Sequence, residues 1–243
     1  MVWKARPVIS SNTDSNPTKI TLDFPQEILG RRRRLIPILL KAKSMDKYKE
    51  SYLRDDKLYI DGKTYTVDTL EHLPDSLDAK SIATKSYENL TMFWGQNSPL
   101  SNHHPTEILI DGTLYNCVEQ YYTHSMAVHA GDFHRADTIM STTDPVIQKH
   151  TVKGMKTSAD WNDISVEIMR TAITAKFTQN ADLKYFLLQT GTTDLVEASP
   201  HDNFWGAGLS MDSPDIVDKS KWKGKNMLGK LLTTLRNSMC ENS

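Results

Sequence analysis

Cysteine, long apolar runs and net charge are all scarce in this chain of 243 residues. Its two cysteines, Cys117 and Cys240, are far apart in sequence, and we interpret both as free thiols in a reducing compartment. No apolar run approaches the roughly 20 residues of a membrane helix, and the N-terminus has no secretory h-region. Lys and Arg number 29 against 30 Asp and Glu, so the whole molecule favours neither nucleic acid nor membrane. We therefore expect a cytoplasmic protein, with the nucleus as an alternative.

The sequence also lacks the common catalytic motifs. It contains no G-x-S-x-G, no Walker loop and no G-x-G-x-x-G. His124, His129 and His134 are spaced by five, which on a helix places successive residues about 140° apart rather than on one face. His103 and His104 form a loop pair with no cysteine or acidic residue beside them in the sequence. We therefore expect no dedicated metal site.

The stretch Val196–Gly208, which reads VEASPHDNFWGAG, concentrates reactive and aromatic residues where regular structure is disfavoured. Pro200 fixes φ and two glycines permit a positive φ, so the stretch predicts a shaped loop. Asp202 lies three residues before Trp205; the carboxylate can accept hydrogen bonds and the indole offers a flat stacking face. Two interpretations stand, a ligand-binding wall or a surface turn with one aromatic residue tucked into the core.

Composition and periodicity divide the chain into four segments. We expect a flexible leader over residues 1–22, a basic helix–hairpin segment over 23–67, a linker over 68–86 and a globular domain over 87–239. The dipeptides Asp61-Gly62 and Asp111-Gly112 each predict a type I′ hairpin. The other expected elements are helices over Val118–Ala130, from Pro145, over Ile164–Phe177, Leu183–Gln189 and Asn226–Met239, and strands at Met92–Trp94 and Leu195–Ala198. The predicted fold class is mainly α (α+β) with a small amount of sheet.

The basic segment carries a local excess of positive charge. Between Pro17 and Lys57 there are eleven Lys or Arg and six Asp or Glu, and the run Arg31–Arg34 lies inside a helical pattern that begins near Asp23 and that Pro37 interrupts. The excess fits either a surface that contacts nucleic-acid phosphates or a solvated helix face. The order FPQEILGRRRRLIPILLKAK, then LRDDKLYIDGKTY, resembles the C-terminal part of the RNA-binding protein of LINE-type retrotransposons. That resemblance implies contact with single-stranded RNA through Arg31–Arg34.

Two helix N-termini are candidate parts of a site. Glu119 falls in the first turn of the helix from Val118, where the helix dipole favours a carboxylate whatever its function. The final helix opens at Gly224-Lys225-Asn226, and its free N–H groups beside lysines suit a phosphate. The alternative there is a capped helix without a ligand.

Several separate motifs follow one another over residues 92–239. They read LSNHHP, IDGTLYNCVEQYY, ADW, KFTQN, LVEASPHDNFWGAGL and GKNMLG. In order and spacing they resemble the NADAR family of N-glycosidases. The resemblance implies a mainly helical fold that hydrolyses N-glycosidic bonds to ribose, in ADP-ribosylated guanine or in phosphorylated riboflavin-pathway intermediates. It implies no metal and no organic cofactor.

The same resemblance implies a set of site residues. Cleavage at an anomeric carbon builds oxocarbenium character, so carboxylates are needed near the ribose, and Glu119 and Asp202 are the matching acids. The other implied positions are Trp205 with Trp94 or Phe93 for a flat leaving group, Lys225, Asn226 and Arg236 for phosphate, and Asn102 and Gly206 for further substrate contacts. Trp161 also matches a family position, where we favour core packing, and Arg236 has the alternative of an ion pair on the final helix.

The sequence departs from the family near the expected site. Many members carry a lysine seven residues after the glutamate of the E-Q-Y motif, which forms an imine with the opened sugar. Here that position is Met126, which closes the covalent route unless another lysine substitutes. His103 replaces a phenylalanine that stacks, and Thr123 and His124 replace glutamine and alanine.

These departures leave three functional expectations. The first is an N-glycosidase that uses Glu119 and Asp202. The second is an inactive reader of an ADP-ribosyl or nucleotide mark, tethered to RNA by the basic segment. The third is a retroelement-derived RNA-binding protein in which the domain is a passenger. The expected partner is accordingly a nucleotide sugar, an ADP-ribosyl compound or a modified nucleic acid.

Overall fold

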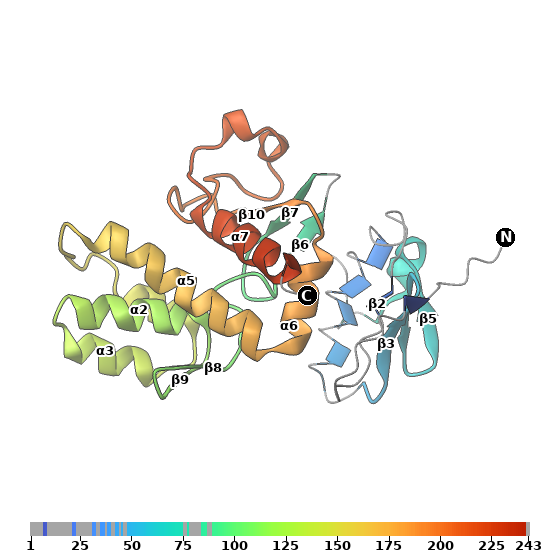
Figure 1. Cartoon of the computed structure of the whole chain (residues 1–243), viewed down its shortest axis with the longest axis horizontal. Coiled ribbons are helices and arrows are strands. Elements are labelled where there is room, and N and C mark those ends of the chain that lie inside the picture. Colours follow the sequence, from blue (N-terminus) through green and yellow to red (C-terminus); the bar gives the residue numbers. More distant parts are fainter. Residues whose placement is uncertain are drawn as a thin grey trace. The chain divides into compact units, whose positions relative to one another are not determined.

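The fold is described from a computed structural model, shown in Figure 1. It covers residues 7–8, 21–22, 31–32, 35–36, 38–39, 42–43, 45, 48–74, 77, 84–86 and 89–241. The chain divides into two units, Met1–His72 and Leu73–Ser243, and each is described by itself. In the described part, no helix combines the length and the apolar character that crossing a bilayer requires.

The first unit contains small antiparallel sheets and a helical stretch. Strand β1 (Pro7–Val8) pairs with β2 (Thr21–Leu22), and a separate sheet has the order β3 (Ser51–Arg54), β4 (Lys57–Ile60), β5 (Lys63–Tyr65), followed by the 3-10 helix η1 (Val67–His72). Asp61 and Gly62 connect β4 to β5 with φ values of 45° and 79°, so the predicted type I′ hairpin is confirmed. Residues 31–32, 35–36, 38–39 and 42–43 are helical. The helix start expected at Asp23 and the interruption at Pro37 lie outside the described residues.

Two of the four consecutive arginines contact the β3–β4 turn of their own unit. Arg31 Nη1 lies 3.1 Å from Asp56 Oδ2, and the buried Arg32 donates from Nη1 to the carbonyl of Asp55. Arg33 and Arg34 lie outside the described residues. RNA contact through this run stays a prediction, and Arg31 and Arg32 also have a role within the fold.

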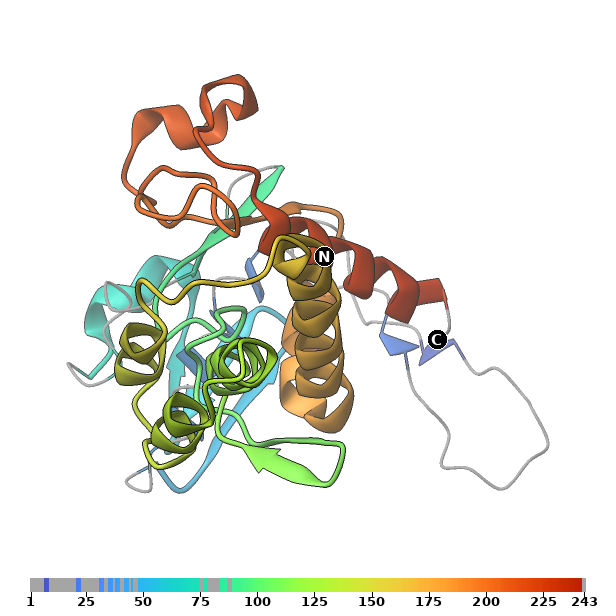
Figure 2. The ribbon, with the colours of Figure 1, turned by 90° about the vertical axis from the view of Figure 1, so that its left-hand side faces the viewer.

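The second unit is mainly helical, as predicted. Its helices are α2 (Val118–His129), α3 (Phe133–Met140), α4 (Pro145–Thr151), α5 (Trp161–Gln179), α6 (Ala181–Gln189) and α7 (Met227–Glu241), with 3-10 helices η4 (Pro214–Val217) and η5 (Lys219–Lys221). Helix α2 contacts α3, α4 and α5 and lies among them in Figure 2. Helix α3 was not expected from the sequence; its buried side is only Ala136 and Ile139, too few apolar positions for a clear stripe.

A three-stranded sheet forms the other layer of this unit. Its order is β10 (Asp194–Glu197), β7 (Leu90–Phe93), β6 (Thr84–Ser86); β10 runs parallel to β7 and β6 antiparallel to it. Residues 84–86 of the expected linker therefore belong to the sheet. The second predicted hairpin joins β8 (Ile108–Ile110) to β9 (Thr113–Tyr115), with φ of 49° at Asp111 and 78° at Gly112.

Helix α7 is fixed to strand β10 by the buried side chain of Asn226. Asn226 Oδ1 accepts from the Glu197 backbone N–H at 3.0 Å, and its Nδ2 donates to the Leu195 carbonyl at 2.9 Å. The residue is 3% exposed and has a φ of 49°, a conformation that asparagine tolerates better than most residues. Asn226 thus sets the position of Glu197 at the end of the sheet.

We expect Asn226→Ala to lower the free energy of unfolding by about 2–4 kcal/mol, because it leaves a buried N–H and a buried carbonyl without partners. Urea denaturation followed by tryptophan fluorescence measures this. Asn162→Ala is the matched control, since Asn162 is exposed on α5 and its replacement should change stability by less than about 0.5 kcal/mol. Equal losses in the two variants would contradict a structural role for Asn226.

Candidate functional site

The second unit contains a cavity made of two adjoining chambers. The large chamber has a volume of about 590 Å³ and the small chamber of about 70 Å³. The side chains that line both are Asn102, Glu119, Lys149 and Trp205. The large chamber falls in the range of small-molecule sites. Four residues at the junction come from four parts of the chain, so the fold itself assembles the site.

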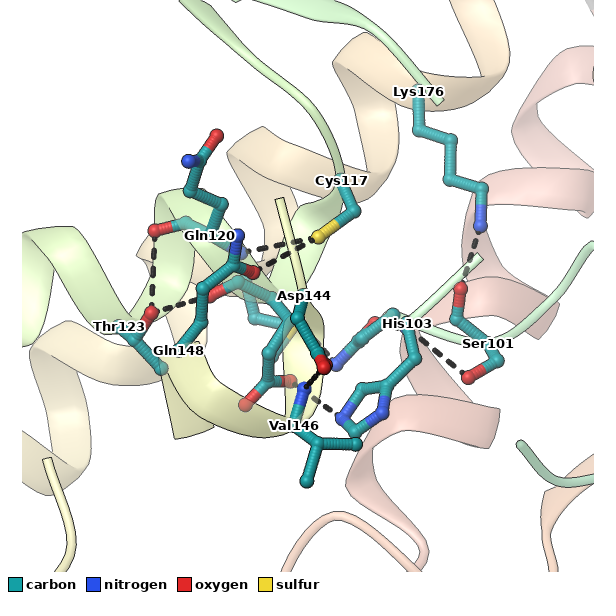
Figure 3. Close-up of polar contacts among 12 residues, drawn as sticks. Ser101, His103, Cys117, Gln120, Thr123, Asp144, Val146, Gln148 and Lys176 are labelled. Atoms are coloured by element: carbon teal, nitrogen blue, oxygen red, sulfur yellow. Dashed lines mark hydrogen bonds and ion pairs between the residues drawn. The ribbon is translucent and has the colours of Figure 1, made fainter. Parts of the chain in front are cut away.

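The loop that carries Asn102 and His103 is held from behind by a buried lysine. Lys176 of α5 donates from Nζ to the Ser101 carbonyl at 2.7 Å, as Figure 3 shows. The Asn102 carbonyl in turn accepts the Glu119 backbone N–H at 3.1 Å, which satisfies one of the free donors at the start of α2. Burial lowers the pKa of Lys176 to about 7, against the opposing effect of Cys117 and Glu197.

A network of buried amides fixes the start of α2 against α4. Gln148, which is fully buried, accepts from Cys117 Sγ at 3.3 Å and donates to the Asn116 side chain at 3.1 Å. Gln120 receives the backbone N–H of Asn116 at 2.8 Å on its side-chain oxygen. Figure 3 shows the Cys117 sulfur in contact with both Gln148 and Gln120. The network holds Lys149, the next residue on α4, at the cavity.

Glu119 reaches the junction of the two chambers from the first turn of α2. It is 5% exposed, and its Oε2 lies 3.4 Å from His103 Nε2. The ring of His103 can therefore pair with the carboxylate. Beside it, the buried Asn102 Oδ1 has no hydrogen-bond partner among the described residues, whereas its Nδ2 contacts Met169 Sδ at 3.4 Å. An unsatisfied buried acceptor on a cavity wall suits a ligand that donates a hydrogen bond.

Glu197, the last residue of β10, is a carboxyl in the small chamber that sequence reasoning missed as a site residue. Burial raises its pKa to about 8, and the charges of Asp202 and Glu119 add to this, whereas Lys149 and Lys176 oppose it. At neutral pH the group therefore keeps its proton. An acidic residue at the end of a short apolar strand, next to small residues, was the signal that could have identified it.

The loop after β10 has the shape predicted for it, and Asp202 holds that shape. Asp202 Oδ1 accepts the backbone N–H groups of Phe204 at 3.0 Å and Trp205 at 2.7 Å. Asp202 is not among the residues that line either chamber. At Gly206 a Cβ would lie 2.9 Å from the Asp202 carbonyl, so glycine permits the close chain approach. Trp205 itself lines both chambers.

Trp205 has aromatic neighbours, of which Tyr122 also lines the large chamber. Tyr122 of α2 meets Trp205 edge-on at a centroid distance of 5.5 Å, and Phe204 does so at 4.9 Å. Trp161 is 5% exposed and lies 5.9 Å from Tyr122, which places it behind the wall in the core. Met126 lines the large chamber, so the thioether occupies the cavity at the position of the family lysine.

The remaining expected residues lie in different places. Trp94 is 53% exposed and lines the small chamber, whereas Phe93 is fully buried in β7. Lys225 lies over the Phe204 ring at 5.2 Å. Asn226 bridges β10 and α7. Arg236 is 2% exposed and donates to Thr190 Oγ1 at 2.9 Å and the Thr193 carbonyl at 2.7 Å.

The histidines are used separately from one another. His129 Nε2 contacts Ser158 Oγ at 2.6 Å, and His124 Nδ1 lies 3.4 Å from the Tyr115 hydroxyl. His104 Nδ1 contacts the Gln96 carbonyl at 3.0 Å, and burial lowers its pKa to about 4. Across the residues that the structure describes, no group of three or more His, Cys, Asp or Glu side chains is arranged to hold a metal ion.

Fold and cavity together define an α+β protein with a ligand-sized cavity that contains buried carboxyl groups and an aromatic wall. The NADAR domain model matches residues 83–240, and the chain belongs to the NADAR family. The match does not reach the basic segment of the first unit.

Known relatives match part of the chain. Protein irg-1 of Caenorhabditis elegans is 33% identical over 129 residues, which are 51% of this chain and 61% of that protein. N-glycosidase R617 of Acanthamoeba polyphaga mimivirus is 34% identical over 124 residues, 50% of this chain and 73% of that protein. The NMR structure of the E. coli protein YbiA is similar with a TM-score of 0.53 at 25% identity, covering 67% of this chain and 91% of YbiA.

The raised pKa of Glu197 makes stability depend on pH. Folded protein keeps this proton over a range in which the unfolded chain, with an ordinary pKa of 4.5, has lost it. The stabilisation is complete below that value and is lost as the pH rises towards about 8. We therefore expect the free energy of unfolding of the natural protein to fall relative to that of Glu197→Gln over this interval, in urea titrations at several pH values. As the control, Glu107→Gln at an exposed position should show the same pH dependence of the free energy of unfolding as the natural protein. If Glu197→Gln also showed that pH dependence, the protonated state of Glu197 in the folded protein would be refuted.

Proposed function

We propose that the second unit hydrolyses an N-glycosidic bond to ribose. The observation that carries the proposal is the pair of buried carboxyl groups, Glu119 and Glu197, in one small chamber beside Trp205. Their surroundings differ, because Glu197 has a pKa of about 8 and keeps a proton, whereas Glu119 faces the imidazole of His103. Two carboxyl groups in unlike environments are a common basis for acid and base roles in glycoside cleavage. Membership of the NADAR family, with a relative named N-glycosidase, supports the same reaction class.

In the proposed hydrolysis the two carboxyl groups have different roles. Glu197 donates its proton to the leaving nitrogen as the bond from C1′ to nitrogen breaks. The Glu119 carboxylate stabilises the oxocarbenium character at C1′ and accepts a proton from the water whose oxygen bonds to C1′. The products are the free base and the ribosyl hydroxyl, and solvent returns the proton from Glu119 to Glu197. Asn102 Oδ1, which has no hydrogen-bond partner among the described residues, accepts a hydrogen bond from a hydroxyl group of the sugar.

Trp205 and Tyr122 make the wall against which a flat leaving group packs. Both side chains line the large chamber, and their rings meet edge-on. We assign Asp202 a positioning role here in place of direct catalysis. Its two hydrogen bonds hold Trp205, and its charge contributes to the raised pKa of Glu197.

A binding protein without turnover is the second candidate function, and Met126 is the observation that favours it. This thioether lines the large chamber at the position of the lysine that forms an imine in many family members. With no amine there, the same cavity would bind an ADP-ribosyl or nucleotide group and release it unchanged. RNA tethering through Arg31–Arg34 belongs to this candidate and stays a proposal.

The central experiment incubates the purified full chain with ADP-ribosylated guanosine and with phosphorylated riboflavin intermediates, and follows the released base by chromatography. We expect Glu119→Gln to lower the rate at least about 100-fold, since general acid–base roles contribute about 10²–10⁴-fold. Binding measured by calorimetry should change far less. Exposed Glu107→Gln is the control and should match the natural protein. Release at an unchanged rate by Glu119→Gln would exclude the proposed role.

Met126→Lys tests whether the amine missing from the cavity limits hydrolysis, and the natural protein measured beside it decides between the two candidate functions. Because a lysine at this position adds an amine to the cavity, we expect hydrolysis to rise at least about tenfold and a sugar adduct to be trapped by borohydride. Met126→Leu keeps the size without the amine and should behave as the natural protein. If the natural protein binds ADP-ribose but releases no base from any substrate, the reader function is the correct one.

A further inference from the structure

His103 and Glu119 form an imidazole–carboxylate pair at the wall of the small chamber. Both side chains line this chamber, and Glu119 Oε2 lies 3.4 Å from His103 Nε2. The two residues come from different elements, because Glu119 stands in the first turn of α2 and His103 in the loop between β7 and β8. The N-terminus of a helix already favours a carboxylate in its first turn. Stability of the charge on Glu119 alone therefore does not explain the imidazole beside it.

Main-chain contacts bring the two side chains together. The Asn102 carbonyl accepts the Glu119 N–H at 3.1 Å, and the His103 N–H donates to Ser101 Oγ at 3.2 Å (Figure 3). Lys176 holds the same loop through the Ser101 carbonyl. The backbone of His103 is thus positioned by hydrogen bonds of the fold, and the pair does not depend on attraction between its two side chains alone.

The two members of the pair differ in their access to solvent. The Glu119 side chain is 7% exposed, whereas that of His103 is 23% exposed. In the proposed hydrolysis, Glu119 accepts a proton from water and has to release it before the next turnover. The more exposed imidazole beside it can pass that proton on to solvent.

His103 is also a suitable proton acceptor among the ionisable side chains that line the small chamber. Lys149 of α4 carries an amine there, but an ammonium group has donors only. Glu197, at the end of β10, is the proton donor of the proposed reaction. His104, the next residue in the loop, lines neither chamber. An ordinary imidazole has a pKa of about 6.5 and an ordinary glutamate one of about 4.3, so proton transfer from a carboxyl group to a neutral imidazole is favourable.

We propose that His103 accepts the proton that Glu119 removes from water, so that the base of the reaction is the pair; this inference rests on the proposed function. As the water oxygen bonds to C1′ and the bond from C1′ to nitrogen breaks, a proton of the water passes to Glu119 and from Oε2 to His103 Nε2. Nε2 accepts it in the neutral tautomer that carries hydrogen on Nδ1, and the imidazolium then releases a proton to solvent. Glu197 protonates the leaving nitrogen and recovers a proton from solvent. Each turnover thus consumes one water and leaves the charges of the protein unchanged.

Release of base by the full chain, measured against pH with the substrate that the natural protein cleaves, tests this role. We expect His103→Phe, which keeps a ring without a nitrogen, to lower kcat at least about tenfold near pH 7.5 and to change KM by less than about twofold. The loss should shrink as the pH falls below about 6, because an imidazole is then protonated and no longer accepts a proton. A residue that only shapes the chamber would give the same loss at every pH.

Imidazole added to the buffer provides a second measurement. His103→Ala leaves room for a free imidazole beside Glu119, so its rate should rise at least about fivefold with added imidazole, whereas the rates of the natural protein and of Glu119→Gln should not. The matched control is His134→Phe, because His134 is exposed on α3 and lines neither chamber. This variant should keep the kcat and the pH profile of the natural protein.

Two kinds of failure can be told apart. If His103→Phe loses the same factor at every pH, or if His103→Ala does not respond to imidazole, the role of His103 is overturned and the hydrolysis stands. If the natural protein releases no base, both the hydrolysis and the role of His103 are overturned.

Discussion

Desolvation of a few ionisable side chains is the constraint on which the rest of this site depends. Glu197 and Lys176 are both buried, and burial moves their pKa values towards neutrality from opposite sides. Each group is placed by backbone contacts, Glu197 through Asn226 and Lys176 through the Ser101 carbonyl. Burying such groups costs stability. The fold tolerates them at the place where a proton donor is useful, which is typical of functional sites.

The two chambers of the cavity hold different ionisable groups, and this division follows from desolvation. A protonated carboxyl group and a paired carboxylate occupy the small chamber, where a reacting bond would lie. Basic side chains of α4 and of the turn after it line the large chamber, and Lys149 among them also lines the small chamber. Lys149 lines both chambers, and its charge lowers the pKa of Glu197, which burial raises. It therefore links the basic groups of the large chamber to the carboxyl groups of the small chamber. The charge of Lys149 thus favours the ionised form of Glu197, whereas burial favours the protonated form.

Local sequence signals predicted the elements well and the site only in part. The hairpin at Asp111-Gly112 follows from backbone preferences that need no tertiary context, and so does the start of α4 at Pro145. Motif order predicted that Glu119 and Trp205 belong to the cavity region. The same signals did not identify Glu197 as a residue of the cavity. They also assigned Asn226 a ligand role, because its sequence context is that of a residue at the start of a helix and does not reveal that its amide bridges β10 and α7. Which side of a chain faces a cavity is decided by packing between distant segments, and no window of sequence contains that information.

Met126 and His103 are departures from the pattern that the resemblance implies, and both lie at the cavity. Met126 removes an amine from the large chamber, whereas His103 adds an imidazole 3.4 Å from the carboxylate of Glu119. An imine route would need an amine that Met126 does not supply, whereas His103 pairs with the acid that the proposed direct attack by water requires. Lys149 meanwhile keeps an ammonium group at the junction of the chambers. Two buried carboxyl groups, a lysine and an Asn102 oxygen that has no partner among the described residues surround one cavity. This arrangement supports the proposal that a ligand binds here and that its chemistry does not pass through an imine at residue 126.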